Sequence, residues 1–211
     1  MQVYPSILVQ NFEEFETKIN LVRGLVDTIH LDIMDGVFVN NKTIYDVDKI
    51  NSFDWGVDYE LHLMIKEKEI EKWFDTGAKR IIFHYEAIKN EQRKMNNIKI
   101  IRKKEKEVGI AVNPETDIRS IFPFLDILDL VLIMSVNPGY SGQKFILETL
   151  EKVKKLLANG FKGIIEIDGG VNESNIRAIA NAGVDVVSVA SAIWNVDKSK
   201  IKDQISKLRI I

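Results

Sequence analysis

Short apolar runs alternate with longer amphipathic segments along the whole chain. Most of these runs are apolar at successive positions rather than at every second one, which is typical of parallel strands buried on both faces. The pattern therefore predicts eight parallel strands. They cover residues 3–9, 28–34, 57–64, 80–87, 107–113, 128–136, 163–170 and 184–191.

The segments between these runs show the apolar spacing of helices. The clearest case is the face formed by Ile146, Leu150, Val153 and Leu157, which recur at helical intervals. The same reasoning predicts three more helices. They are marked by Ile70, Trp73 and Phe74 before Gly77, by Ile176 and Ile179 between Asn172 and Gly183, and by Ile201, Ile205 and Leu208.

The number of predicted strands fits one compact architecture. Eight strand–helix units in 211 residues leave roughly 26 residues for each, which is close to the minimum for such a unit. No linker, low-complexity segment or charge block marks a domain boundary. We therefore expect a single α/β domain over residues 1–211, folded as a (β/α)8 TIM barrel. Periodicity does not show whether a sheet closes, so a doubly wound open sheet is the structural alternative.

Composition and charge narrow the range of partners. The 29 Lys and Arg residues are balanced by 31 Asp and Glu, so no basic excess is available for a nucleic-acid backbone. The absence of Cys excludes disulfides, thiolate metal sites and a cysteine nucleophile. No apolar run approaches the roughly 18 residues of a membrane span, and the start lacks the pattern of a signal peptide. We expect a soluble, cytoplasmic protein with no nucleic-acid or membrane partner.

All three histidines lie in predicted strands, and two of them lie close to acidic residues that face the same way. His30 and Asp32 share one strand face because they are two residues apart, while His62 and Asp168 lie in other strands. In a closed barrel these four side chains could surround one divalent cation, namely Zn²⁺, Fe²⁺, Mn²⁺ or Co²⁺. From the residues alone, a structural network of hydrogen bonds is an equally good interpretation. We expect His84 to be structural or to support the ligands.

Small residues follow three of the predicted strands at the rim where barrels of this type bind phosphate. Gly139 and Gly142 precede a helix and let backbone amides approach an anion. Further amides would come from Gly169, Gly170, Ala190 and Ser191. One glycine-rich turn usually reflects turn geometry only, but three on one rim predict a phosphate site formed by amides rather than by Lys or Arg.

Three methionines lie near the ends of different predicted strands. They are Met34, Met64 and Met134. Methionine at such positions usually fills the core. The alternative is that the three side chains form an apolar sleeve around a reacting carbon.

Taken in order, these motifs resemble the ribulose-phosphate 3-epimerase family over residues 3–195. The matching segments are 6–8, 30–39, 62–64, 84–86, 113–116, 134–145, 168–171 and 191–193. The resemblance implies a (β/α)8 barrel that binds one divalent metal ion and interconverts D-ribulose 5-phosphate and D-xylulose 5-phosphate by inverting C3. Family members form dimers and larger rings, so the resemblance also allows for a homo-oligomer.

The resemblance implies a role for each matching residue. His30, Asp32, His62 and Asp168 would be the metal ligands, and Asp32 and Asp168 would also be the acid/base pair. Inversion suits two separated carboxylates, because one removes the C3 proton and the other delivers a proton to the opposite face, while a metal stabilises the enediolate. The implied substrate contacts are Ser6, Met34, His62, Met64, Met134, Gly139, Tyr140, Ser141, Gly142, Gly169, Gly170, Ala190 and Ser191.

The chain departs from the usual family pattern at several positions. The family usually has Pro at the position of Asn40 and Ala-Asp at the positions of Gln10-Asn11. Trp194 replaces the usual Phe, and for this replacement we expect an adjustment of packing only. Ala190 replaces the usual Gly of the eighth strand. If that position requires a positive φ or a very close approach of phosphate, the added methyl weakens binding.

Other functions compete with the pentose-phosphate epimerase. The changes at Asn40 and Ala190 motivate an epimerase of a related ketose phosphate, such as allulose 6-phosphate. A metal-dependent sugar-phosphate lyase is less well supported, because such enzymes usually carry a Lys among the strand-end carboxylates. A barrel that only binds a sugar phosphate would not need a complete acid/base and metal set.

Overall fold

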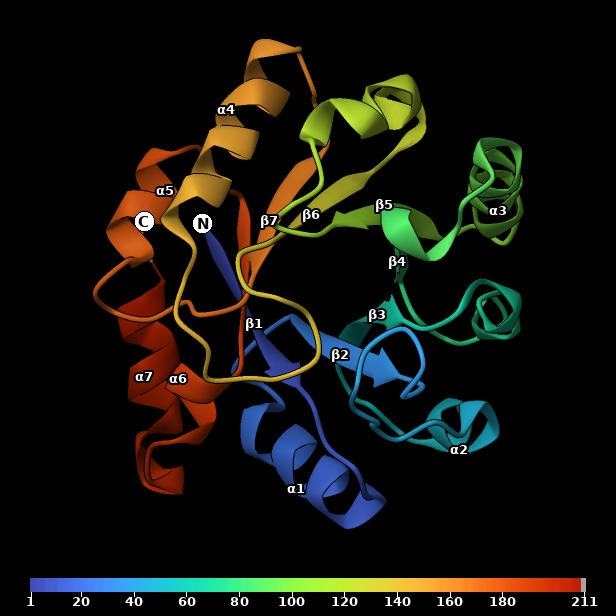
Figure 1. Cartoon of the computed structure of the whole chain (residues 1–211). Coiled ribbons are helices and arrows are strands. Elements are labelled where there is room, and N and C mark those ends of the chain that lie inside the picture. The colour runs from blue at the N-terminus through green and yellow to red at the C-terminus, as the bar shows by residue number, and fades with distance from the viewer. Residues whose placement is uncertain (210–211) are drawn as a thin grey trace.

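Eight parallel strands form a closed barrel in the computed structural model, which describes residues 1–209. Each strand pairs with the next one in the sequence, and β8 pairs with β1. Figure 1 shows the strands at the centre and the helices around them. The predicted TIM barrel is confirmed, and the open sheet is excluded.

The strands agree with the predicted apolar runs to within a few residues. Every residue of β2 is buried, because one face of the strand packs on the helices and the other fills the barrel. The bounds are β1 Gln2–Ile7, β2 Thr28–Met34, β3 Asp58–Met64, β4 Arg80–His84, β5 Glu107–Val112, β6 Leu130–Met134, β7 Ile164–Asp168 and β8 Val186–Val189.

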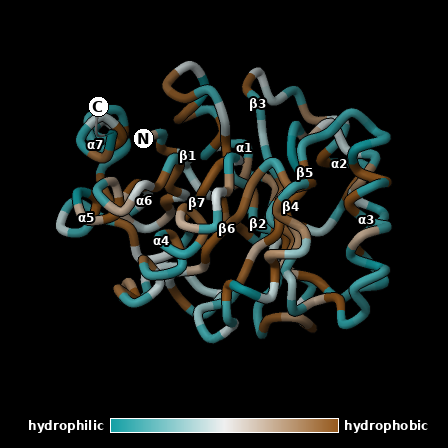
Figure 2. The backbone as a smooth tube through the Cα atoms, turned by 90° about the horizontal axis from the view of Figure 1, so that it is seen from above, coloured by the Kyte–Doolittle hydropathy of each residue, from teal (hydrophilic) through white to brown (hydrophobic). Residues whose placement is uncertain are grey.

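The α-helices cover the outside of the barrel. In Figure 2 the strands are mostly brown, whereas helices such as α3 turn hydrophilic residues outward. Helix α1 begins after Asn11, whose side chain accepts a hydrogen bond from the Glu14 amide, so Asn serves as the cap at this position. The bounds are α1 Phe12–Val22, α2 Val47–Ser52, α3 Glu91–Lys103, α4 Leu150–Ala158, α5 Ile176–Asn181, α6 Ser191–Trp194 and α7 Ile201–Leu208.

Three of the predicted helices need correction. The α-helix expected around Ile70–Phe74 is wrong, because this segment forms two single 3₁₀ turns, Glu67–Glu69 and Glu71–Trp73, that bury Trp73 and Phe74 against the barrel. The helix expected after Asn172 begins only at Ile176, since the Asn172 side chain accepts from the Ser174 amide in a turn. Helix α4 is likewise preceded by a 3₁₀ turn, Leu147–Thr149.

The strand–helix repeat is also incomplete after β5. The connection there is the 3₁₀ segment Ile118–Ile127, which contains Pro123. Proline has no N–H and cannot make the hydrogen bond of a regular α-helix. The 3₁₀ segment still buries Ile118, Ile121 and Phe124, so it covers the barrel as a helix would.

The interior of the barrel contains an apolar cluster and a group of buried charges. Ile82, Ala111, Leu130 and Leu132 form the apolar cluster on β4, β5 and β6. Charged side chains from β3, β4 and β7 are also buried, and these include Glu60, Arg80 and Glu166. The candidate site lies above these charges. Within residues 1–209, no helix combines the length and apolar character that crossing a membrane requires.

Candidate active site

A pocket opens at the C-terminal ends of the strands. Fourteen of the residues expected at the site line it, namely Ser6, Asp32, Met34, Met64, Met134, Gly139, Tyr140, Ser141, Gly142, Asp168, Gly169, Gly170, Ala190 and Ser191. The expected residues His30 and His62 lie beneath it, fully buried. The pocket is also lined by five residues that were not predicted as site residues, namely Leu8, Val136, Pro138, Val171 and Ser188. Among the described residues of the lining there is no Lys or Arg.

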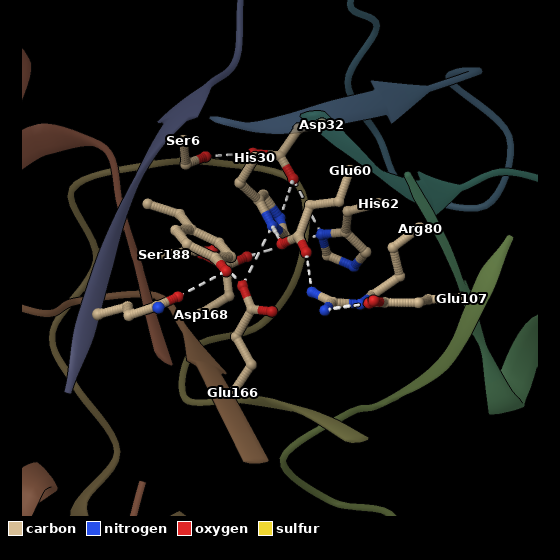
Figure 3. Close-up of polar contacts among 12 residues, drawn as sticks. Ser6, His30, Asp32, Glu60, His62, Arg80, Glu107, Glu166, Asp168 and Ser188 are labelled. Atoms are coloured by element: carbon tan, nitrogen blue, oxygen red, sulfur yellow. Dashed lines mark hydrogen bonds and ion pairs between the residues drawn. The ribbon is translucent and has the colours of Figure 1, made fainter. Parts of the chain in front are cut away.

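Four expected metal ligands meet at the floor of this pocket. His30 and Asp32 come from β2, His62 from β3 and Asp168 from β7, and one donor atom of each lies within 4.8 Å of the others. Asp32 and His62 are register partners, which places them at the same level of the barrel. Figure 3 shows His30, Asp32 and His62 pointing toward one another.

Asp32 Oδ1 is the atom on which the two imidazoles converge. His62 Nδ1 lies 2.9 Å from it and His30 Nε2 lies 3.4 Å from it. Asp168 Oδ2 is 3.7 Å from His62 Nδ1. The other Asp32 oxygen, Oδ2, accepts a hydrogen bond of 2.6 Å from the Ser6 hydroxyl. Asp32 therefore has one oxygen directed to the imidazoles and one held by Ser6.

The donor atoms fit a divalent cation. His30 Nε2 is fully buried and has no hydrogen-bond partner within residues 1–209. On the other side of the ring, Nδ1 lies 2.6 Å from Glu60 Oε1, so Nδ1 carries a proton, and in the neutral ring Nε2 then presents a lone pair. A buried lone pair without a partner is costly, and a metal ion would use it. Two imidazoles and two carboxylates suit Zn²⁺, Fe²⁺, Mn²⁺ or Co²⁺.

The two carboxylates have opposite electrostatic environments. Burial raises the pKa of Asp168 to about 8, and the negative charge of Asp32 adds to the increase. Burial alone would also raise the pKa of Asp32, but the neighbouring imidazoles of His30 and His62 outweigh it and hold that pKa well below its usual range. Burial lowers the pKa of His62 to about 4, so this imidazole is neutral at pH 7. Carboxylates whose pKa values are driven apart are typical of acid/base pairs.

The glycine turns at the rim have backbone conformations that other residues avoid. Gly139, Gly142, Gly169 and Gly170 have φ values of 121°, 80°, 110° and 65°. A Cβ atom on Gly169 would lie 2.3 Å from Val136 Cγ2, and one on Gly170 would lie 2.6 Å from the Phe145 nitrogen. All four positions favour glycine for conformation, and Gly169 and Gly170 also require it for space.

The position of Ala190 does not require glycine on conformational grounds. Its φ is −99°, which any residue can adopt, and its side chain lies at the pocket. The condition of a positive φ is therefore not met at Ala190, and weaker binding through a close approach of phosphate stays a prediction.

Trp194 does more than adjust packing, contrary to expectation. Its indole Nε1 donates a hydrogen bond of 2.6 Å to the Ser6 carbonyl. Ser6 in turn holds Asp32, so the indole supports the strand end beside the site. Phe could not replace this contact, because it has no N–H.

Two loops far apart in the sequence join over the pocket. The Tyr140 hydroxyl donates to the Asn40 carbonyl, and Asn41 Nδ2 donates a hydrogen bond of 2.7 Å to the Gly139 carbonyl. In Figure 1 the yellow segment between β6 and α4 runs across the end of the barrel. This contact could not be predicted from the sequence, because backbone carbonyls accept both hydrogen bonds.

A polar layer beneath the four ligands was also missed. Arg80 Nη1 donates a hydrogen bond of 2.5 Å to Glu60 Oε2, and its Nη2 donates to Glu107. Glu166 Oε1 lies 3.2 Å from His30 Nδ1 and accepts from the Ser188 hydroxyl. The sequence pattern could have predicted this layer, because Glu60 and Glu166 each lie two residues before an expected ligand and so share its strand face.

Comparison with known proteins identifies the family of the sequence. A profile described as the ribulose-phosphate 3 epimerase family matches residues 2–194. The chain is 36% identical to ribulose-phosphate 3-epimerase of Bacillus subtilis (strain 168), covering 99% of this chain and 98% of that protein. It is 34% identical to ribulose-phosphate 3-epimerase of Escherichia coli (strain K12), covering 98% of this chain and 94% of that protein.

Similar solved structures share the fold at low identity. One is 3-hexulose-6-phosphate synthase from Salmonella typhimurium, with a TM-score of 0.72, 17% identity, and coverage of 99% of this chain and 100% of that one. Another is KGPDC from Streptococcus mutans in complex with D-R5P, with a TM-score of 0.72, 15% identity, and coverage of 98% of this chain and 97% of that one. These two show the fold alone. The sequence matches establish that the chain belongs to the ribulose-phosphate 3-epimerase family and is an isomerase of that type.

Proposed function

We propose that this protein interconverts D-ribulose 5-phosphate and D-xylulose 5-phosphate by inverting C3. One observation carries the proposal: two carboxylates from separate strands, Asp32 and Asp168, share a buried four-donor group at the floor of a pocket with glycine turns at its rim. The pocket has the chemistry that a phosphorylated ketose requires. Its lining offers proton-transfer groups at the floor and backbone amides at the rim.

His30 Nε2, His62 Nδ1, Asp32 and Asp168 would hold one divalent ion. Such an ion, when bound, stabilises negative charge that develops on substrate oxygens. The protein holds His30 Nε2 ready by hydrogen bonding Nδ1 to Glu60. Burial excludes water from both imidazoles, which strengthens the electrostatic interactions between the site and the substrate.

Asp32 and Asp168 would move the protons at C3. One carboxylate removes the C3 proton from one face of the carbon, and the other returns a proton to the opposite face, so the configuration inverts. In the reverse reaction the two residues exchange roles. Ser6 keeps Asp32 in place through the hydrogen bond to Oδ2. Met34, Met64 and Met134 would pack around the planar intermediate without offering it a competing proton.

Backbone amides would bind the phosphate. The described lining has no Lys or Arg, so the turns 139–142 and 169–170, with Ala190 and Ser191, are the groups available to an anion. The lack of Lys in the lining also argues against a lyase. A six-carbon ketose phosphate is the alternative substrate, motivated by the changes at Asn40 and Ala190.

The test is a direct assay on five- and six-carbon substrates. Purified protein loaded with one equivalent of metal should convert ribulose 5-phosphate to xylulose 5-phosphate, lose activity to a strong chelator, and regain it on addition of the metal. A higher kcat/KM on allulose 6-phosphate would replace the proposed substrate. Tight binding of the sugar phosphate without turnover would contradict the enzymatic proposal.

A further inference from the structure

A chain of polar groups lies behind His62, on the side away from Asp32. His62 Nε2 is 2.8 Å from Nε2 of His84, the last residue of β4. His84 Nδ1 is 3.3 Å from Glu86 Oε2, in the 3₁₀ turn Tyr85–Ala87. Both imidazoles are fully buried. The acid/base chemistry described above does not use His84 or Glu86.

The contacts of Glu86 determine where the protons lie in this series of polar groups. The backbone N–H of Asn113 donates a hydrogen bond of 2.9 Å to Glu86 Oε1, and a backbone amide is always a donor. Glu86 Oε2 faces His84 Nδ1, so an ionised carboxylate accepts from both groups at once. His84 therefore carries its proton on Nδ1. If the ring is neutral, its Nε2 is a bare acceptor.

A neutral His62 has one ring proton but two neighbours that could accept it. A neutral imidazole has one N–H and one lone pair. His84 Nε2 is the acceptor beside His62 Nε2. Asp32 Oδ1, at 2.9 Å from His62 Nδ1, is a second acceptor. One ring proton cannot satisfy both neighbours. A cation held by Asp32 and His62 would satisfy both neighbours, because it would use the lone pair on Nδ1 and leave the proton on Nε2.

We propose that Glu86, acting through His84, is a positioning residue that directs the His62 proton to Nε2 and so frees Nδ1 for the metal. This inference deepens the proposed function and rests on its metal centre. It parallels the other side of the site, where Glu60 fixes the proton of His30 on Nδ1. Each histidine thus presents a bare nitrogen to the same point because a carboxylate controls the opposite end.

Glu86→Gln is the sharpest test, because it keeps the shape and removes one acceptor. The one side-chain oxygen left in this variant can accept from Asn113 or from His84, and the amide NH₂ must face the other group. Zinc affinity, measured by competition with a chromophoric chelator, should fall by about 10- to 100-fold. The matched control is Glu16→Gln, which makes the same change at an exposed residue of α1 and should leave zinc affinity unchanged.

Two further measurements separate this role from a merely structural one. With His84→Gln present, adding Glu86→Gln should cause no further loss of zinc affinity, because the effect of Glu86 passes through His84. Long-range ¹H–¹⁵N spectra of the zinc-loaded wild type should show His84 protonated on Nδ1 and His62 on Nε2. Only three histidines need assignment.

The outcomes distinguish this inference from the proposed function. Failure of the wild-type protein to bind zinc would contradict the metal centre itself. Tight zinc binding by the wild type with unchanged affinity in Glu86→Gln would contradict this inference alone. A proton on His84 Nε2 in the zinc-loaded protein would also contradict it.

Discussion

The two sides of the barrel rim supply different kinds of group. Strands β2 to β4 supply side chains, His30, Asp32, His62 and His84, and we call this the metal half. The loops after β6 to β8 supply mainly backbone, and we call this the phosphate half. Under the proposed function, the metal half would depend on which side chains are present. The phosphate half would depend on φ values that only glycine adopts readily, as at Gly170.

Asp168 connects the two halves. It ends β7, next to the glycine turn 169–170, yet it completes the group of donors on the metal half. Substitutions in the metal half should therefore change the chemical step, and those in the phosphate half should change substrate binding. Substitutions of Asp168 test the connection between them.

The largest effect is expected from removing either carboxylate. Asp32→Asn and Asp168→Asn should each lower kcat by about 10³-fold, because each removes a proton-transfer group, typically worth 10²–10⁴-fold. The change is to be measured with saturating ribulose 5-phosphate. Asp48→Asn, at an exposed position of α2, is the control and should retain kcat. Full activity in either variant would contradict a mechanism with two carboxylates.

A smaller effect, on binding, is expected from Gly170→Ala. The new Cβ would meet the Phe145 nitrogen at 2.6 Å in a backbone with a φ of 65°. We expect KM to rise by about tenfold and stability to fall by about 1–3 kcal/mol, with a smaller change in kcat. The control is Gly24→Ala, where φ is 77° and nothing lies within 4 Å. It should cost about 1–2 kcal/mol of stability and leave KM unchanged, so a rise in KM for both variants would contradict a local effect.

The pH dependence of stability tests the environment of Asp168. Burial raises its pKa from 3.8 to about 8, so between these values the folded metal-free protein holds a proton that the unfolded chain lacks. The folded state then binds more protons than the unfolded state, and stability falls as pH rises through this range. Urea unfolding of the metal-free protein at about pH 5 and about pH 8 should show the decrease. Asp168→Asn should make it smaller, and an unchanged slope would contradict the assignment.

The smallest effect is expected where the two halves touch. Tyr140→Phe removes the hydroxyl that donates to the Asn40 carbonyl and leaves the ring in place. A single hydrogen bond contributes about 0.5–1.5 kcal/mol, so we expect a change in KM of about two- to fivefold with kcat retained. A loss of kcat comparable to that of the Asn variants would show that this contact belongs to the chemical step.

The metal half was the more predictable from sequence. His30 and Asp32 lie two residues apart in a run of buried strand residues, which was enough to place them on one inward face. The same rule applied to Glu60 and Glu166 would have revealed the polar layer. The proton positions in His62 and His84 could not be predicted, because they depend on ring nitrogens that approach to 2.8 Å in the folded barrel.

The phosphate half was less predictable because loop backbone decides its geometry. Glycines at 139, 142, 169 and 170 indicated turns, but not that Gly170 abuts the Phe145 backbone. The φ of Ala190 and the hydrogen bond from Trp194 to the Ser6 carbonyl likewise depend on tertiary contacts. The 3₁₀ turns that end at Trp73 were not predicted, because apolar spacing over one or two turns does not distinguish a 3₁₀ helix from an α-helix.

The central claim is that two carboxylates act on opposite faces of C3. The direct measurement is the reaction of metal-loaded protein with ribulose 5-phosphate in D₂O, sampled in the first turnovers. We predict that xylulose 5-phosphate carries deuterium at C3 while the unreacted ribulose 5-phosphate still carries protium there. Xylulose 5-phosphate that retains the original protium at C3 would mean that a single group carries the proton across, and would contradict the account.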